Sequence, residues 1–379
     1  GGSSWGSLLD RSEYNVQSTV LNHGAKLVAG ADLPLDFVIK KSLLDEILLQ
    51  YKYISKLAIK LLTDVFKLQE HLQSLRCFHF MELADWADLF IISLQHLKWL
   101  DTKGDKRISE IQKALELAIQ RSSCEGDPHK DRLYVYLKGN HLEHLSSSAW
   151  GINSLNFMGL GYHIDWPVNI ILTPAALGIY SDIFNFLMQV KLAVFSLSSA
   201  WLSLKVLYSF FCEALLTRHR TSSEYFNFSL PVKHMVFHFV STLQQYVRVQ
   251  LSQLSWYKFQ HSIKYKVKDM YDLESEHMAY LTESLHICFL SEETRHIAAA
   301  VENILQCAME YHSSLMGRRM GLVQSIRRRF IQNLEELYLM RLKSPKEGGG
   351  GGIGCLWDML NFNKYYGGIL SSRQIGSSL

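Results

Sequence analysis

The sequence predicts an all-α protein, an elongated stack of helical bundles. Only six prolines occur in 379 residues, so long stretches contain no residue that breaks a helix. Apolar residues recur at three- and four-residue spacing almost throughout, as in helices that bury one face. With 48% hydrophobic and 20% charged residues, the chain has the composition of a folded protein and the length for two or three cores.

The N-terminal part predicts amphipathic helices. After a short apolar segment, Leu33–Ile39, apolar residues keep to one face from Leu44 to Leu75, which is about eight turns of helix. Such a stripe requires a partner helix. Further helices are expected over residues 75–94 and near residues 108–119, and the polar residues 122–132 have the composition of a turn.

One short segment, Trp166–Leu172, predicts extended and largely buried backbone. Pro167 restricts its own φ and pushes Trp166 toward an extended conformation, and the run after it is rich in β-branched residues. Thr173 and Pro174 then have the character of an N-cap and a first helical residue, so a helix is expected to begin near Pro174.

Residues 168–216 are apolar enough to raise the question of a membrane span. The charged residues Asp182, Lys191, Lys205 and Glu213 divide this stretch into pieces shorter than the roughly 18 uncharged residues that a spanning helix needs. Helices buried inside a protein are therefore expected here, and no membrane span.

The remaining helices and the domain division follow from composition. A polar loop is expected at 217–229, helices at 230–247 and 267–281, and another beginning near Met320. The predicted organisation is a flexible or fragmentary stub at 1–32, a first helical bundle at 33–145, a connection at 146–161, a second helical bundle at 162–366 interrupted by a glycine-rich loop at 344–354, and a tail at 367–379.

Charge and cysteines limit the choice of partners and compartment. A net charge of +3 is near balance for this length and favours neither nucleic acid nor a membrane surface. The six cysteines are scattered without a Cys-x-x-Cys motif, so free thiols in a reducing compartment are expected, which favours the cytosol.

Four separated segments resemble one known family. Residues 162–173 read Tyr-His-Ile-Asp-Trp-Pro-Val-Asn-Ile-Ile-Leu-Thr and precede a helix with the pattern Tyr-x-x-Ile-Phe-x-Phe-Leu from Tyr180. Residues 234–247, 267–281 and 360–366 follow in order, with further patterns of histidine, tyrosine and asparagine. The chain resembles the carboxy-terminal half of the gamma-tubulin complex proteins, more the members numbered five and six than the fourth.

The resemblance implies a non-catalytic scaffold that binds gamma-tubulin, associates with other gamma-tubulin complex proteins and helps to nucleate microtubules. It implies a location in the cytoplasm at a microtubule-organising centre or spindle pole, with no cofactor, metal, nucleic acid or small-molecule substrate. The family-signature and candidate partner-binding residues are Tyr162, Trp166, Pro167, Asn169, Tyr180, His234, Tyr246, His277, Arg318, Arg319, Arg327, Arg328, Asn363, Tyr365 and Tyr366.

Among these candidates the expected environments differ. Core packing is expected for Trp166, whereas Tyr365 and Tyr366 suit a core and an interface equally. The arginine clusters flank the helix near Met320 and form either a solvated face or a contact with an acidic partner; tubulin-family surfaces are acidic.

Two other classes of protein remain as alternatives. An unrelated helical adaptor or tethering subunit would share the long amphipathic helices but lack the ordered matches. A divergent metal-binding enzyme is the second alternative. Gly2–Gly6 fits the nucleophile motif Gly-x-Ser-x-Gly, but it has no flanking strand and helix. The histidine pairs His141/His144 and His234/His238 could bind a metal, but both lack a third ligand.

Overall fold

The computed structural model describes residues 39–96, 105–138, 151–214, 220–316, 320–343 and 352–369. The chain divides into two compact units, residues 1–55 and 56–379. Helices make up most of the described residues, which include one two-stranded sheet. The prediction of an all-α protein with one short extended part is confirmed. The predicted stub and residues 370–379 of the predicted tail lie outside the described residues.

The elements, in chain order, are α3 (Asp45–Lys60), α4 (Leu68–Phe78), α5 (Asp85–His96), α6 (Asp105–Gln120), β1 (Leu133–Leu137), β2 (Met158–Tyr162), α7 (Pro174–Ala214), α8 (Arg220–Val247), α9 (Trp256–Tyr265), α10 (Met270–Ile287), α11 (Arg295–Met316), α12 (Met320–Lys343) and α13 (Ile353–Leu360). A π-helical segment, Arg248–Ser255, joins α8 to α9.

The predicted single helix from Leu44 to Leu75 is interrupted. α3 is followed by a π-helical turn, Leu61–Val65, and α4 begins only at Leu68. Between them Lys67 has φ 55°, a left-handed conformation that no right-handed helix continues through. The apolar spacing therefore identified a helical region correctly, but the backbone at Lys67 divides it.

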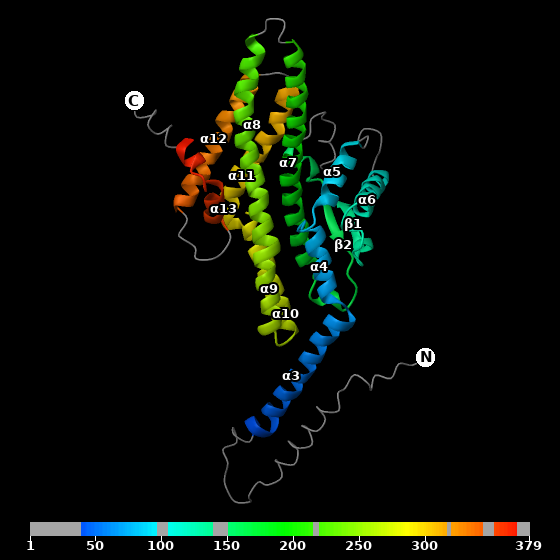
Figure 1. Cartoon of the computed structure of the whole chain (residues 1–379). Helices are drawn as coiled ribbons and strands as arrows, with labels where there is room; N and C mark the ends of the chain where they lie inside the picture. Colours follow the sequence, from blue (N-terminus) through cyan, green and yellow to red (C-terminus); the bar gives the residue numbers. More distant parts are fainter. Residues whose placement is uncertain are drawn as a thin grey trace, which may run out of the picture. The chain divides into compact units, whose positions relative to one another are not determined.

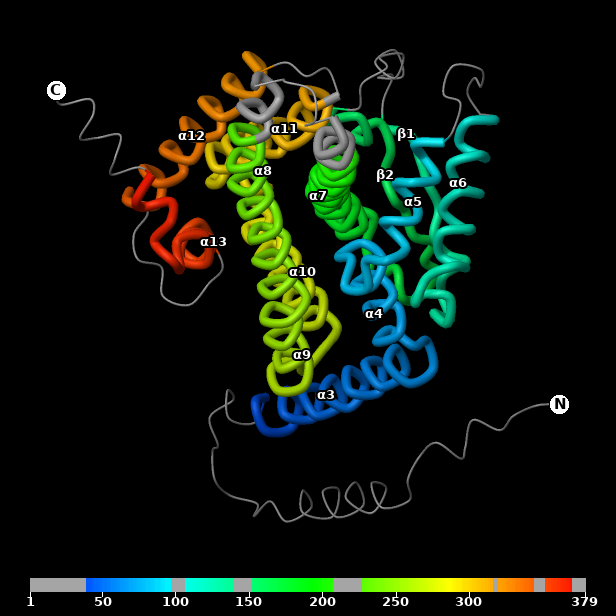
Figure 2. Tube along the Cα trace, turned by 45° about the horizontal axis from the view of Figure 1, so that its top comes forward, coloured from blue at the N-terminus to red at the C-terminus, as the bar shows by residue number. Residues whose placement is uncertain are grey.

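The centre of the second unit is α7, which packs against α5, α8, α10, α11 and the face of β2. Figure 1 shows α7 and α8 running side by side, and Figure 2 shows α4 and α5 on the other flank of α7. The predicted start of this helix is confirmed, because the Ala176 N–H lies 3.2 Å from the Thr173 Oγ1 that caps it.

The part of α7 from Pro174 to Val206 is long and apolar enough to cross a membrane by length and composition alone. In its most apolar window 61% of the residues are buried inside the described molecule. A core helix of a soluble protein passes the same test, so this property is weak evidence for a span.

The extended residues lie just before the segment predicted for them. β1 and β2 pair antiparallel, with Leu133 opposite Tyr162. Val168–Ile170 forms a single 3₁₀ turn instead of a strand. The Ile170 and Ile171 N–H groups donate to the carbonyls of Pro167 and Val168, so they are not available to a neighbouring strand.

The prediction of a loop at 217–229 is wrong from Arg220 onward. α8 already begins at Arg220 and contains Pro231 within its length. The helix expected near 108–119 corresponds to α6, and the one expected near Met320 begins there as α12. α10 begins after Asp269, whose side chain accepts a hydrogen bond from the Asp272 N–H.

Gly159 of β2 allows the hairpin to pack closely against α7. At Gly159 an added Cβ would lie 2.4 Å from Cζ of Tyr136 on β1 and 2.8 Å from Oγ of Ser181 on α7. The Tyr136 hydroxyl donates to the same Ser181 Oγ at 2.8 Å, so neither atom can move away without breaking that bond. Gly159 therefore sets the spacing between the hairpin and α7.

Gly159→Ala is expected to lower the free energy of unfolding by about 1–3 kcal/mol, because the methyl group overpacks the Tyr136–Ser181 contact. Urea unfolding of the full chain measures this. The matched control is Gly178→Ala in α7, where nothing lies within 4 Å of the added Cβ. That substitution is expected to be neutral or stabilising by up to about 1 kcal/mol, and equal losses in both variants would contradict the explanation.

Candidate protein-binding surface

Several signature residues lie in the core. Tyr180 of α7 and His277 of α10 are both buried, with the Tyr180 hydroxyl 3.1 Å from His277 Nε2. Burial lowers the pKa of His277 to about 4, so its imidazole is neutral near pH 7. This pair connects two core helices and is closed to a partner protein.

Tyr162 and Tyr246 are also core residues. The Tyr162 hydroxyl lies 2.9 Å from Nδ1 of the buried His71 on α4. Tyr246 of α8 is fully buried and stacks on Phe289, with ring centroids 5.9 Å apart. The structure therefore gives these signature tyrosines a role in joining helices and the hairpin.

Trp166 is exposed, contrary to the prediction of core packing. Its side chain is 74% exposed and its ring meets the edge of Phe66 at a centroid distance of 6.5 Å. The 3₁₀ turn directs Val168 into the core, while Pro167, joined to Trp166 by a cis peptide, is buried and Asn169 is exposed. Pro167 and Val168 are therefore buried side by side, without the alternation of a strand, and Trp166 lies outside.

The terminal signature residues divide between core and surface. Tyr366 is fully buried, and its hydroxyl lies 2.8 Å from the Met235 carbonyl oxygen and 3.1 Å from His238 Nδ1, both on α8. Its ring also lies 6.3 Å from that of Phe330 on α12. Tyr365 is 47% exposed, so the buried tyrosine holds the segment in place while its neighbour faces outward.

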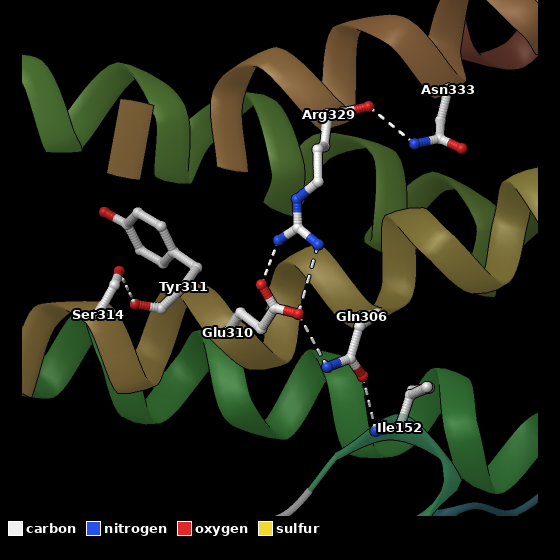
Figure 3. Close-up of polar contacts among 7 residues, drawn as sticks. All are labelled: Ile152, Gln306, Glu310, Tyr311, Ser314, Arg329 and Asn333. Carbon is white, nitrogen blue, oxygen red and sulfur yellow. Dashed lines mark hydrogen bonds and ion pairs between the residues drawn. The ribbon is translucent and has the colours of Figure 1, made fainter. Parts of the chain in front are cut away.

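The arginine cluster of α12 is split by the fold. Arg329 pairs with Glu310 of α11, whose Oε1 also accepts from the Gln306 Nε2 at 3.0 Å. Gln306 Oε1 in turn accepts from the Ile152 N–H at 3.1 Å, as Figure 3 shows. Arg329 therefore belongs to a polar chain that connects α12, α11 and the turn before β2.

The other two arginines of this cluster, Arg327 and Arg328, are exposed. Arg327 lies one helical turn before Phe330 on α12. The ring of Phe330 packs near the ring of Tyr366, which links this part of α12 to the terminal segment. We define the α12–C-terminal surface as six exposed residues. Two lie on α12 and four lie between α13 and Tyr366: Arg327, Arg328, Phe362, Asn363, Lys364 and Tyr365.

Basic and aromatic groups together characterise this surface. Arginine and tyrosine are enriched at the energetic centres of protein interfaces, and a basic surface attracts an acidic partner. Phe362 and Lys364 were missed by sequence reasoning, although both lie within the matched segment 360–366, because nothing local distinguishes exposed Phe362 from buried Tyr366.

A groove of about 1320 Å³ lies beside this surface, lined by residues of α8, the α10–α11 connection, α12 and α13. Arg341 of α12 and Asp358 of α13 both line it and form an ion pair at 2.9 Å. The groove contains no arrangement of nucleophile, base and third group of the kind that a hydrolase needs.

The remaining candidates do not form a site. His234 is exposed, and its predicted companion His238 bonds to Tyr366 instead. Across the described ranges no group of three His, Cys, Asp or Glu side chains could hold a metal ion. Arg318, Arg319, His141 and His144 lie outside the described residues.

Comparison with known proteins supplies the family. The profile described as "Gamma tubulin complex component C-terminal" matches residues 68–366. Gamma-tubulin complex component 6 of Mus musculus is 27% identical over 309 residues, covering 81% of this chain and 17% of its own length. Spindle pole body component alp6 of Schizosaccharomyces pombe is 24% identical over 264 residues, covering 68% and 30%.

Gamma-tubulin complex component 5 of Macaca fascicularis is 24% identical over 259 residues, covering 65% of this chain and 35% of its own length. The predicted likeness to the members numbered five and six is confirmed. The chain spans about a sixth to a third of the length of these curated relatives.

The Arg329–Glu310 pair generates a stability prediction. Arg329→Met is expected to cost about 1 kcal/mol, a value kept low because both side chains are partly exposed and water screens the pair. Urea unfolding measures it, with Arg328→Met as the matched control on the same helix. The control is expected to stay within about 0.5 kcal/mol of the unaltered chain, and an equal loss would show that Arg329 contributes no more than a solvated arginine.

The buried histidines predict a loss of stability in acid. Burial lowers the pKa of both His79 and His277 to about 4, below the ordinary histidine value of 6.5. As the pH falls from about 6.5 to 4, the unfolded chain binds protons that the folded chain does not, so the free energy of unfolding decreases. Above pH 6.5 both states are neutral at these positions and the effect disappears.

The measurement is the urea midpoint at several pH values. His277→Gln removes one titrating group and keeps a polar side chain beside Tyr180, so its stability is expected to change less steeply between pH 6.5 and 4. Carboxylates contribute equally to both proteins, and an unchanged slope would show that His277 is not the source.

Proposed function

Because the chain belongs to the gamma tubulin complex component C-terminal family, we propose that it binds gamma-tubulin as a non-catalytic scaffold of a gamma-tubulin complex. The observation that carries this proposal is the match over residues 68–366, which includes almost all of the described helices. The chain covers a minor part of its relatives' length, so the activity proposed is that of this part.

The proposed mechanism is geometric. Several such subunits, lying beside other gamma-tubulin complex proteins, would hold gamma-tubulins at the spacing of a microtubule end. Presenting them together removes the entropic cost of bringing the first subunits into register. The chain itself then needs a stiff frame and a docking surface. The packed helices around α7 supply the frame.

The α12–C-terminal surface is our candidate for the contact with gamma-tubulin. It combines two exposed arginines of α12 with a lysine and exposed aromatic rings of the terminal segment, which Tyr366 fastens to α8. These features complement an acidic partner, and the fixed backbone lowers the entropy lost on binding. Nothing in this mechanism uses a cofactor, nucleic acid, small-molecule substrate or membrane, and we place α7 in the core.

The proposed location is the cytoplasm, at a microtubule-organising centre or spindle pole. Two observations support it. One relative is a spindle pole body component of fission yeast. The other is that Cys77, Cys124, Cys288, Cys307 and Cys355 are all free, as in proteins of reducing compartments.

The first test is co-purification of the chain with gamma-tubulin, followed by size measurement at low and moderate salt. A one-to-one complex that weakens as salt increases is the expected result, because exposed charges are screened within about 10 Å at 0.1 M salt. A folded chain that binds no gamma-tubulin would contradict the proposal and favour an adaptor that shares only the fold.

Arg327→Glu combined with Arg328→Glu tests the surface. The double variant is expected to weaken gamma-tubulin binding about tenfold or more through like-charge repulsion, with an unchanged urea midpoint. The matched control is Lys106→Glu with Lys113→Glu, which reverses two exposed charges on α6. Equal weakening by both pairs would show a response to net charge and not to this surface.

A further inference from the structure

Two cysteine thiols meet where α4 lies against the connection between α6 and β1. Cys77 is in the last turn of α4, and Cys124 is in the turns that follow α6. Both residues are buried and both thiols are free. The two side chains contact each other, and this contact is the largest cause of a raised pKa at Cys77 and a lowered pKa at Cys124. Residues distant in the sequence therefore form one dithiol.

Two other contacts hold the same segments in register. The rings of His71 on α4 and His129 in the connection stack at a centroid distance of 4.0 Å. One turn further along α4, the Ser74 hydroxyl lies 2.8 and 2.9 Å from the two carboxylate oxygens of Asp127. The dithiol is the third pair in this series, because its cysteine on α4 follows Ser74 by three residues and its other cysteine precedes Asp127 by three.

The connection is also fastened to α5. The carboxylate of Asp85 accepts hydrogen bonds from the Ser123 N–H at 2.7 Å and from the Ser123 hydroxyl at 2.8 Å. The Asp127 N–H donates to the Cys124 carbonyl oxygen at 3.1 Å, which closes a turn. Contacts on both sides in the sequence thus restrict Cys124. Two thiols that the fold already holds together react with each other at a high effective concentration.

A cavity reaches the neighbours of the Cys124 thiol. The Sγ of Cys124 lies 3.7 Å from the carbonyl oxygen of Leu83. Leu83, Asp85 and Ser123 all line a cavity of about 540 Å³ between the α4–α5 connection, α7 and α8. A molecule as small as hydrogen peroxide fits in such a space, since one water occupies only about 30 Å³ in the liquid.

The two thiols differ in reactivity. The contact with Cys77 and the hydroxyl groups of Ser122 and Ser123 lower the pKa of Cys124, although burial opposes them. The same thiol contact and burial raise the pKa of Cys77. Because the thiolate is the form that attacks an oxidant, oxidation is expected to begin at Cys124.

We propose that Cys77 and Cys124 form an oxidation site, at which a hydroperoxide converts the two thiols into a disulfide that links α4 to the α6–β1 connection. In reducing compartments such disulfides are transient and belong to redox-sensing proteins, which agrees with free thiols in the resting state. This inference does not depend on the proposed function, because neither cysteine belongs to the α12–C-terminal surface.

The reaction has two steps. The Cys124 thiolate attacks one oxygen of the hydroperoxide, so that an S–O bond forms, the O–O bond breaks, and the departing oxygen takes up a proton as an alcohol or water. The Cys77 sulfur then attacks the sulfur of the Cys124 sulfenic acid. An S–S bond forms and the S–O bond breaks, and water leaves with the Cys77 thiol proton. Two thiols thus lose two electrons and two protons to the hydroperoxide.

Zinc binding is the other common use of paired thiols. Structural zinc takes four protein ligands. In the part of the chain that the structure describes, no group of three His, Cys, Asp or Glu side chains could hold a metal ion. The surroundings of the dithiol therefore favour disulfide formation.

The test treats the reduced full chain with a small excess of hydrogen peroxide, blocks the remaining thiols with iodoacetamide and digests the product with trypsin. Trypsin releases Cys77 in the peptide 77–98 and Cys124 in the peptide 122–130, each without a second cysteine. The expected product is these two peptides joined, about 2 Da below the sum of their masses and separated by dithiothreitol. Absence of the joined peptides overturns the proposal.

Cys355 tests whether exposure alone explains the reaction. This cysteine is only partly buried, and its Sγ lies 3.2 Å from Gln250 Nε2. If exposure decided the rate, Cys355 would be oxidised before the joined peptides appear. The reverse order is expected, because contact between the thiols favours the disulfide. Prior oxidation of Cys355, or joined peptides that form only after unfolding in urea, contradicts the proposal.

Single variants separate the two steps. In Cys77→Ser the reaction is expected to stop at the Cys124 sulfenic acid, which adds about 16 Da and is trapped by dimedone. In Cys124→Ser the Cys77 thiol is expected to stay unoxidised at the same dose. The matched control is Cys307→Ser, which removes another buried thiol and is expected to give the full yield of joined peptides. An equal loss of yield in this control would assign the effect to disturbed packing and overturn the proposal.

The disulfide is also expected to raise the urea midpoint of the oxidised chain, because closing a loop lowers the entropy of the unfolded state. Dithiothreitol is expected to return the midpoint to that of the reduced chain. A lower midpoint after oxidation would show that the disulfide strains the fold, against a site at which the folded chain already brings the thiols together.

Discussion

Burial of α7 is the constraint on which the rest of the second unit depends. This helix contacts α5, α8, α10, α11 and the hairpin, and its side chains Ile183, Phe184 and Leu197 are almost completely buried. A helix that is apolar around most of its circumference requires partners on several sides, and the flanking helices supply them along much of α7, although Leu202 and Val206 are exposed. The surface discussed above is formed on helices that this packing holds in place.

A small number of polar contacts then determine how the helices meet. Tyr180 with His277, Tyr162 with His71, and Tyr366 with the α8 backbone each join segments that are distant in the sequence. A buried hydroxyl without a partner costs about 1–3 kcal/mol, so these contacts disfavour alternative packings. This accounts for the core positions of several signature residues, because they specify how the helices pack.

The candidate surface depends on how the fold anchors the end of the described chain. The α12–C-terminal surface includes a segment that one buried tyrosine fastens to α8, and it lies next to a large groove. Basic side chains and exposed rings occur together there, which is the combination that we propose for contact with an acidic partner.

The sequence by itself determined the helical class, the start of α7 at Pro174 and the order of the family motifs, because periodicity, capping and motif spacing are local properties of the chain. It did not determine which motif residues face outward. Trp166 and Tyr366 both lie within family motifs, yet Trp166 is exposed and Tyr366 is buried. Only the tertiary structure decided this for Tyr366, since its burial depends on contacts with α8 and α12, whose residues are remote in the chain. The exposure of Trp166 accompanies the 3₁₀ turn at Val168, which the local run of β-branched residues did not indicate.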